Sequence, residues 1–164
     1  MYVKNLKTLR LIAMTLGIAG CAVMCCSLTA PATGNSSVSL LEYMDVKVMN
    51  AFGLIMMGAV FSLFGYAVPQ ILNGLFAAIW AGFMCWETTG YLSVNPGLGM
   101  YLLILSAAFM MVSGILFIIH KKHSRFGPSG IIPMPFGKIE VFCTVSMGLS
   151  ILMFSVFEVL KIRP

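Results

Sequence analysis

Four long stretches of this chain contain no Asp, Glu, Lys or Arg: residues 11–41, 48–86, 88–120 and 141–157. Uncharged stretches of about 17 residues or more can cross a hydrocarbon core about 30 Å thick as helices. Only 9% of the 164 residues are charged and 60% are apolar, whereas soluble domains have about 25% charged residues. The sequence therefore predicts an all-α integral membrane protein that forms a single transmembrane bundle over residues 1–164.

The second stretch decides the number of crossings. As one helix its about 39 residues would extend about 58 Å, nearly twice the thickness of the core, so the chain must turn back within it. Pro69 lies near its centre, and proline interrupts helices. We therefore predict five transmembrane helices, joined by short loops into antiparallel hairpins, at about Leu11–Ala30, Val48–Val68, Gln70–Gly90, Leu98–His120 and Ile139–Leu160.

The basic residues predict the orientation, because cytoplasmic loops are enriched in Lys and Arg. An N-terminus on the cytoplasmic side places seven basic residues inside and three outside. Lys161 and Arg163 fall on the outer side, against the rule, and leave a four-crossing variant with a re-entrant last segment as the alternative. The inner residues are Lys4, Lys7, Arg10, Lys121, Lys122, Arg125 and Lys138.

The first crossing has two other interpretations. Basic residues before an apolar run, with Ala30-Pro31-Ala32 beyond it, are typical of a cleaved secretory signal. Ile18-Ala19-Gly20-Cys21 also resembles a bacterial lipoprotein signal. We expect a retained helix instead, because the apolar run continues well past Cys21.

The third predicted crossing carries a continuous face of small residues. In lipid, small residues allow helix backbones to approach closely, so that dispersion forces hold them together. The face is predicted to pack on the second crossing, its hairpin neighbour, at Gly58, Ser62 and Gly65. The functional alternative is that it binds a second protein or a second copy of this chain. Its residues, at helical spacings of three and four, are Gly74, Ala77, Ala78, Ala81, Gly82 and Cys85.

Two segments outside the crossings carry surface signals. The segment from Lys121 to Lys138 is the longest basic loop and contains no acidic residue. Its cations are predicted to contact anionic lipid headgroups at the inner face or to dock a partner: Lys121, Lys122, Arg125 and Lys138. Asn35 begins an N-glycosylation sequence on the outer side. The basic residues separate apolar stretches and form no aromatic-studded patch, so no nucleic-acid partner is expected.

The chain offers little reactive chemistry. His120 and His123 have no neighbouring acid or cysteine in the sequence, and the five cysteines lack the spacing of a metal site. Glu140 opens the last crossing, where a helix N-terminus favours an anion. Asn50 and Asn73 are expected to make hydrogen bonds between helices but not to bond each other. We expect no enzymatic activity, no cofactor and no metal.

These observations predict a small, non-catalytic accessory or scaffold subunit of a membrane protein complex. Its partners would be other membrane subunits or copies of itself. One alternative is a small channel or transporter built from several copies, with Asn50, Asn73 and Glu87 along a shared pathway. A more distant alternative is a membrane-embedded redox or other enzyme that uses Cys21, Cys85 and Cys143.

Overall fold

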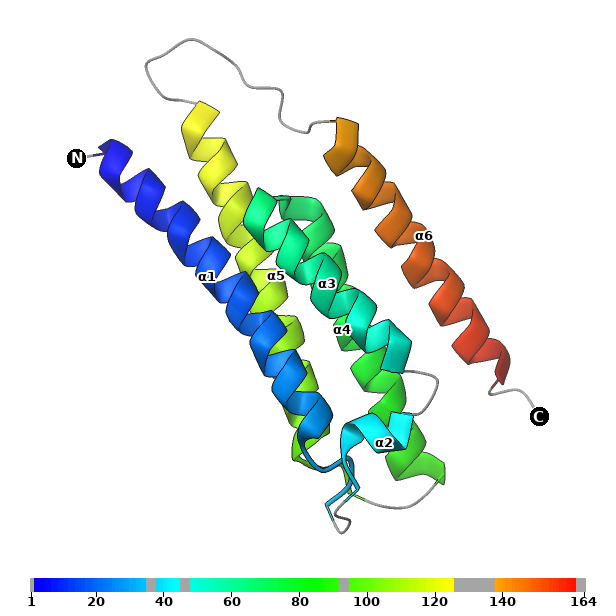
Figure 1. The fold of residues 1–164 in the computed structure, drawn as a ribbon. Helices are drawn as coiled ribbons and strands as arrows, with labels where there is room; N and C mark the ends of the chain where they lie inside the picture. Colours follow the sequence, from blue (N-terminus) through cyan, green and yellow to red (C-terminus); the bar gives the residue numbers. More distant parts are fainter. Residues whose placement is uncertain (1, 35–37, 45–47, 92–94, 126–137, 162–164) are drawn as a thin grey trace.

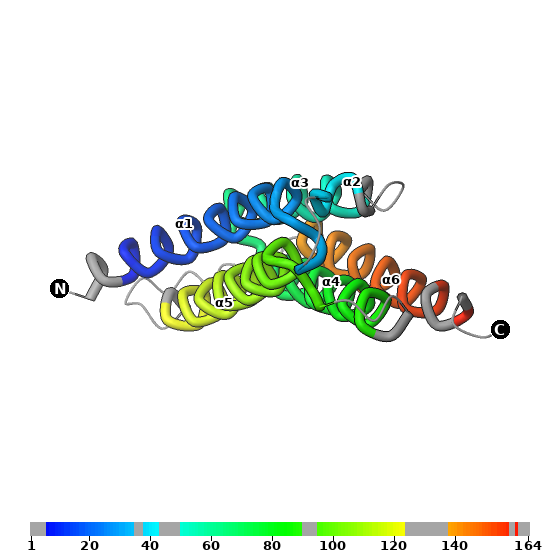
Figure 2. Tube along the Cα trace, turned by 90° about the horizontal axis from the view of Figure 1, so that it is seen from below, coloured from blue at the N-terminus to red at the C-terminus, as the bar shows by residue number. Residues whose placement is uncertain are grey.

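A computed structural model of the chain describes residues 2–34, 38–44, 48–91, 95–125 and 138–161. Within these ranges the chain is almost entirely helical, which confirms the predicted all-α membrane class. Helices α1, α3, α4 and α5 form a bundle, and α6 lies at one side of it, against α4 (Figure 1). In Figure 2, α1 and α3 lie over α5 and α4. The helices are α1 (Tyr2–Thr29), α2 (Leu40–Met44), α3 (Val48–Phe64), α4 (Ala67–Trp86), α5 (Leu98–Arg125) and α6 (Lys138–Lys161), and a π-helical turn, η2 (Glu87–Tyr91), continues α4.

Four of these helices are long and apolar enough to cross a membrane: Leu6–Thr29, Ala67–Thr89, Leu98–His123 and Lys138–Phe157. The remaining helix of the predicted five, α3, is shorter, and its apolar part covers Asn50–Phe64. The short element is therefore α3 and not the last segment, which was the predicted source of a four-crossing variant. Length and composition support α6 as a full crossing.

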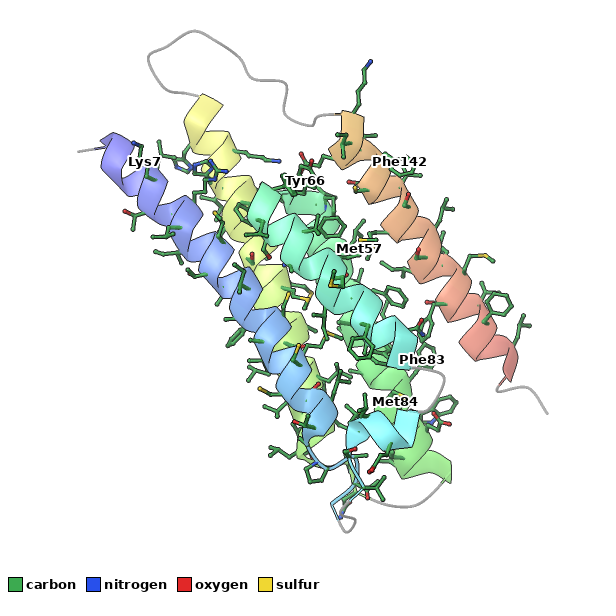
Figure 3. The ribbon with its side chains drawn as sticks, in the orientation of Figure 1. Lys7, Met57, Tyr66, Phe83, Met84 and Phe142 are labelled. Carbon is green, nitrogen blue, oxygen red and sulfur yellow. The ribbon has the colours of Figure 1, made fainter. Side chains whose placement is uncertain are left out.

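The start of α1, the end of α5 and the start of α6 lie together at one end of the molecule (Figure 1). We call it the basic end, because it contains Lys7, Arg10, Lys121, Lys122 and Lys138; Lys7 is labelled in Figure 3. Helix α6 runs from the basic end to the opposite end of the molecule. The predicted grouping of these cations on one face of the membrane agrees with this arrangement of helices.

The turn between α3 and α4 differs from the prediction, which placed it at Pro69. Helix α3 ends at Phe64, and Gly65 has a φ of +71°, a backbone conformation that glycine adopts without steric cost. Tyr66 is then extended and precedes the first residue of α4. Pro69 falls in the first turn of α4, where a missing N–H removes no helical hydrogen bond. The second and third crossings therefore meet at Gly65 and Tyr66.

Helices α1 and α5 pack closely through small residues. A Cβ atom at Gly20 would lie 3.2 Å from the Ser106 carbonyl oxygen, and one at Gly99 would lie 2.9 Å from the Ser27 carbonyl oxygen. At the end opposite the basic end, the Gly99 N–H donates to the Pro31 oxygen at 2.9 Å. Small residues thus bring the two backbones into direct contact, and α4 approaches α5 equally closely at Gly74 and Gly114.

Helix α6 is much less buried than the rest. Only 11% of its membrane window is buried within the chain, against 39–44% for the other three spans. Its apolar contact with the bundle includes the Phe154 ring, whose centroid lies 5.1 Å from that of Phe76 and 6.1 Å from that of Phe83, labelled in Figure 3. Most of the apolar surface of α6 is consequently left to lipid or to another protein.

Candidate functional site: helix faces and a buried polar cluster

The inner part of the small-residue face of α4 packs on α5. A Cβ atom at Gly74 would lie 2.7 Å from Met111 Cγ and 2.9 Å from the Ala107 carbonyl oxygen, and Ala77 and Ala81 are fully buried. The predicted partner was the hairpin neighbour, now α3, and for Gly74 this prediction is wrong, since α5 lies against it. Hairpin connectivity makes α3 a neighbour of α4, but side-chain size decides which backbone approaches most closely.

The outer part of the same face is covered only in part, since Ala78 and Cys85 pack against the hydrophobic core of the bundle. A Cβ atom at Gly82 would have no atom of the described residues within 4 Å, and Gly82 is exposed. Ala78 and Cys85, one turn away on either side, are half-buried. We call Ala78, Gly82 and Cys85 the outer row. The predicted face therefore divides into a row that builds the bundle and a row that lies at its surface.

The small residues predicted on the second crossing lie at the centre of the bundle. A Cβ atom at Gly58 would lie 2.9 Å from both Asn73 Nδ2 and Cys21 Sγ, so this glycine meets α4 and α1 at once. The Ser62 hydroxyl occupies the space above Gly17 of α1. Gly65 forms the turn. None of these positions is available to a partner outside the chain.

Four polar residues from three helices lie inside the bundle: Ser62, Gln70, Asn73 and Ser113, all fully buried. We call them the buried polar cluster. Gln70 Nε2 donates to Ser62 Oγ at 3.1 Å, and Ser62 Oγ donates to the Gly58 carbonyl oxygen at 2.7 Å. These bonds join α4 to α3.

The other two members of the cluster reach further helices. Asn73 Nδ2 donates to the Leu54 carbonyl oxygen at 3.0 Å and to Met110 Sδ at 3.4 Å. Ser113 Oγ donates to the Ala13 carbonyl oxygen of α1 at 2.7 Å. The expected bonding of Asn73 between helices is confirmed. Together the cluster connects all four helices of the bundle.

A second polar junction joins three helices at the basic end. Both carboxylate oxygens of Glu140 lie 2.7 Å from Lys121 Nζ, and Glu140 Oε1 also accepts the Ala67 N–H at 2.9 Å. Glu140 is 3% exposed. The carboxylate thus sits at the N-terminus of α4, where the partial positive charge of the helix favours an anion. It also lies in the first turn of its own helix, α6, as its sequence position predicted.

This junction changes the interpretation of the basic loop. Helix α5 continues to Arg125, so Lys121 and Lys122 are helical, and the Lys121 ammonium is held by Glu140. Lys121 is therefore paired within the chain, while 31% of its side chain stays exposed, and its contact with lipid headgroups stays a prediction. Lys122 and Lys138 are exposed. Asn35 and residues 126–137 of the loop lie outside the described residues.

The residues of the two alternative functions lie in different environments. Asn50 is exposed on α3, Asn73 is enclosed in the cluster, and Glu87 is half-buried at the end of α4. As expected, Asn50 and Asn73 do not bond each other. Cys21, Cys85 and Cys143 are free thiols on three different helices. In the described ranges no three His, Cys, Asp or Glu residues lie close enough together to hold a metal ion.

Sequence reasoning passed over Gln70, Ser113 and the role of Glu140. Gln70 is the one glutamine of the chain, and it lies within an uncharged stretch, which is an unusual place for a long amide side chain. Assigning the turn to Pro69 put it at the end of a helix. With the turn at Gly65, Gln70 faces Ser62 across the hairpin, and a polar pair becomes visible.

Compared with protein-family models, curated proteins and solved structures, the chain matches none of them.

Proposed function

We propose that this multi-pass membrane protein is a small, non-catalytic accessory or scaffold subunit of a membrane protein complex, which binds its partner through the outer row of α4. The observation that carries the proposal is that exposed Gly82 has small residues one turn away on each side, Ala78 and Cys85, whereas the exposed Gly53 of α3 has none. Helix α4 has small residues on two adjoining sides: the inner side is fully buried, whereas the outer side is only partly covered, with Gly82 exposed at its centre.

Small residues on a membrane helix allow another helix backbone to approach closely. A surface that faces only lipid does not need them, because bulky apolar side chains suit lipid equally well. Gly74 meets that expectation against α5. Gly82 has open space where its side chain would be, and its neighbours Ala78 and Cys85 are partly accessible. A helix of a partner subunit, or of a second copy, would approach α4 there as closely as α5 does on the inner side.

The arrangement of polar groups favours a structural role over transport. The side chains of the buried polar cluster donate hydrogen bonds to carbonyl, hydroxyl and thioether acceptors of the same chain. Asn73, which the channel alternative needs on a shared pathway, is fully buried in its own bundle. A pathway between copies would require it on the outer surface.

The basic end is proposed to face the cytoplasm, with the N-terminus, as the excess of Lys and Arg indicates. There Lys122 and Lys138 are exposed and would contact anionic lipid headgroups.

The proposal is tested by Gly82→Leu. The full-length protein is purified from its native membrane in mild detergent, and the mass and stoichiometry of the particle that contains it are measured. We expect wild-type protein in a defined complex and the variant released from it. Gly53→Leu is the matched control, because Gly53 is also an exposed helix glycine with no described atom within 4 Å of its Cβ position.

A complex that survives Gly82→Leu unchanged would count against the outer row as the binding surface. A wild-type protein that purifies without any stoichiometric partner or second copy would overturn the proposed function itself. Gly74→Leu is unsuitable here, because it would disturb the bundle before any partner is considered.

A further inference from the structure

Two side-chain oxygens of the buried polar cluster have no hydrogen-bond donor among the described residues: Gln70 Oε1 and Asn73 Oδ1. Both residues are fully buried. They lie three positions apart on α4, and therefore one turn apart on the same face. A buried acceptor without a donor is unfavourable in an apolar interior, and more so in a bilayer, where no bulk water can reach it.

Rotating the amide groups does not remove the deficit. Ser62 has one hydroxyl proton, which it donates to Gly58, and it accepts from Gln70 Nε2. A rotated Gln70 would take that proton and leave its own NH2 group without an acceptor.

A rotated Asn73 would be worse. Its oxygen would replace the NH2 group that now donates to the Leu54 oxygen and to Met110 Sδ, so three acceptors would face one another. The hydrogen bonds therefore fix both amides with their oxygens unsatisfied.

The missing group must bring two hydrogen-bond donors to two neutral acceptors. A cation has no carboxylate to balance it here, because the buried acid of the described residues, Glu140, is held by Lys121 at the basic end. An uncompensated charge inside the bundle is strongly disfavoured. A water molecule carries two donors and no charge, and buried waters occupy polar sites with two or more partners.

We propose that one buried water molecule binds between Gln70 and Asn73, donating one hydrogen to Gln70 Oε1 and the other to Asn73 Oδ1. The water completes the cluster. It links the hydrogen bonds that join α4 to Ser62 of α3 with those that join α4 to Met110 of α5. Gly58 makes the arrangement feasible, since a Cβ atom there would lie 2.9 Å from Asn73 Nδ2 and displace the amide.

The test uses the chain's one glutamine. Full-length protein labelled with 15N in the glutamine side chain gives a single NH2 signal, from Gln70. In detergent micelles or nanodiscs, we expect a nuclear Overhauser contact between these protons and a long-lived water. Asn73→Leu removes one of the two acceptors and should weaken the contact at least several-fold. Asn50→Leu is the matched control, because Asn50 is exposed on α3, and it should leave the contact unchanged.

Three results would overturn the proposal. The first is a wild-type Gln70 signal without any water contact, which decides the matter even if Asn73→Leu does not fold. The second is a contact of full strength in a folded Asn73→Leu protein, since the water would then not bridge the two residues. The third is a shift of the Gln70 signals when sodium chloride is replaced by choline chloride, which would identify a bound cation instead.

Discussion

Removing the charge of Lys121 should destabilise the protein more than removing the charge of Glu140. In Lys121→Met, a carboxylate that is 3% exposed keeps the Ala67 N–H but loses both contacts with the ammonium. Leaving one buried partner of an ion pair costs about 3–5 kcal/mol. In Glu140→Gln, the amide oxygen can still accept from Ala67, and Lys121, which is 31% exposed, can turn towards water. The loss should then be about 1–3 kcal/mol, the range for a buried polar group that loses its hydrogen-bond partner.

The double variant, Lys121→Met with Glu140→Gln, should lose no more than about 1 kcal/mol, because no charge is left without a partner. The two single losses sum to at least about 4 kcal/mol, so the coupling energy should be about 3 kcal/mol or more. The free energy of unfolding can be measured by titrating micelles of the full-length protein with SDS. Fluorescence of the two tryptophans reports the transition, since Trp80 is 1% exposed in the folded chain.

Lys122→Met is the matched control, because Lys122 is exposed on the same helix end. Its effect should stay within about 0.5 kcal/mol, as is usual at surface positions. A coupling energy below about 0.5 kcal/mol, or a Lys121→Met loss no larger than that of the control, would refute the view that this ion pair holds α4, α5 and α6 together.

Five variants test the packing, the turn and one hydrogen bond between helices, each in the same unfolding assay unless stated. Gly74→Leu should destabilise the bundle by about 3 kcal/mol or more, because backbone atoms of α5 block the new side chain, whereas Gly82→Leu should change stability by less than about 0.5 kcal/mol; equal effects would contradict the division into inner and outer rows. Gly65→Ala should cost about 1–2 kcal/mol, because its φ is +71°, and no loss would mean that the turn has another geometry. Pro69→Ala should leave the hairpin intact in amide exchange, and fusion of the two helices would place the break at the proline after all. Ser113→Ala should cost about 0.6–1.7 kcal/mol through its lost bond to a carbonyl of α1; an unchanged stability would show that this bond contributes nothing.

The membrane class and the approximate helix positions could be predicted because charge is so costly in hydrocarbon that its absence marks the crossings directly. The residues at which the helices begin and end could be predicted less accurately. Proline is unfavourable in a helix interior but tolerated in the first turn, so Pro69 is compatible with a break at its own position or a few residues earlier. The positive φ of Gly65 decides between them, and it is a property of the folded backbone.

The choice of helix partners was beyond the sequence for a different reason. The small residues of α4 indicate that some backbone comes close to it. Which helix packs against these small residues depends on side chains far away in the sequence. Met111 of α5, for example, lies against Gly74 of α4.

The polar groups were missed for the same reason as the turn. The turn was placed at Pro69, four residues after Gly65. With that turn, Ser62 and Gln70 are not predicted to lie at the same depth in the membrane, so their hydrogen bond was not expected.

The short connection of Gly65 and Tyr66 has a consequence for biogenesis. From Phe64 to Ala67 the chain can reach at most about 11 Å, far less than the roughly 30 Å of the hydrocarbon core, so α3 cannot remain on one surface while α4 is threaded through from the other. The two must enter the bilayer as a pair. A helix of 17 residues, about 25 Å long, therefore does not need to be recognised as a membrane segment by the insertion machinery on its own, because α4 carries it in.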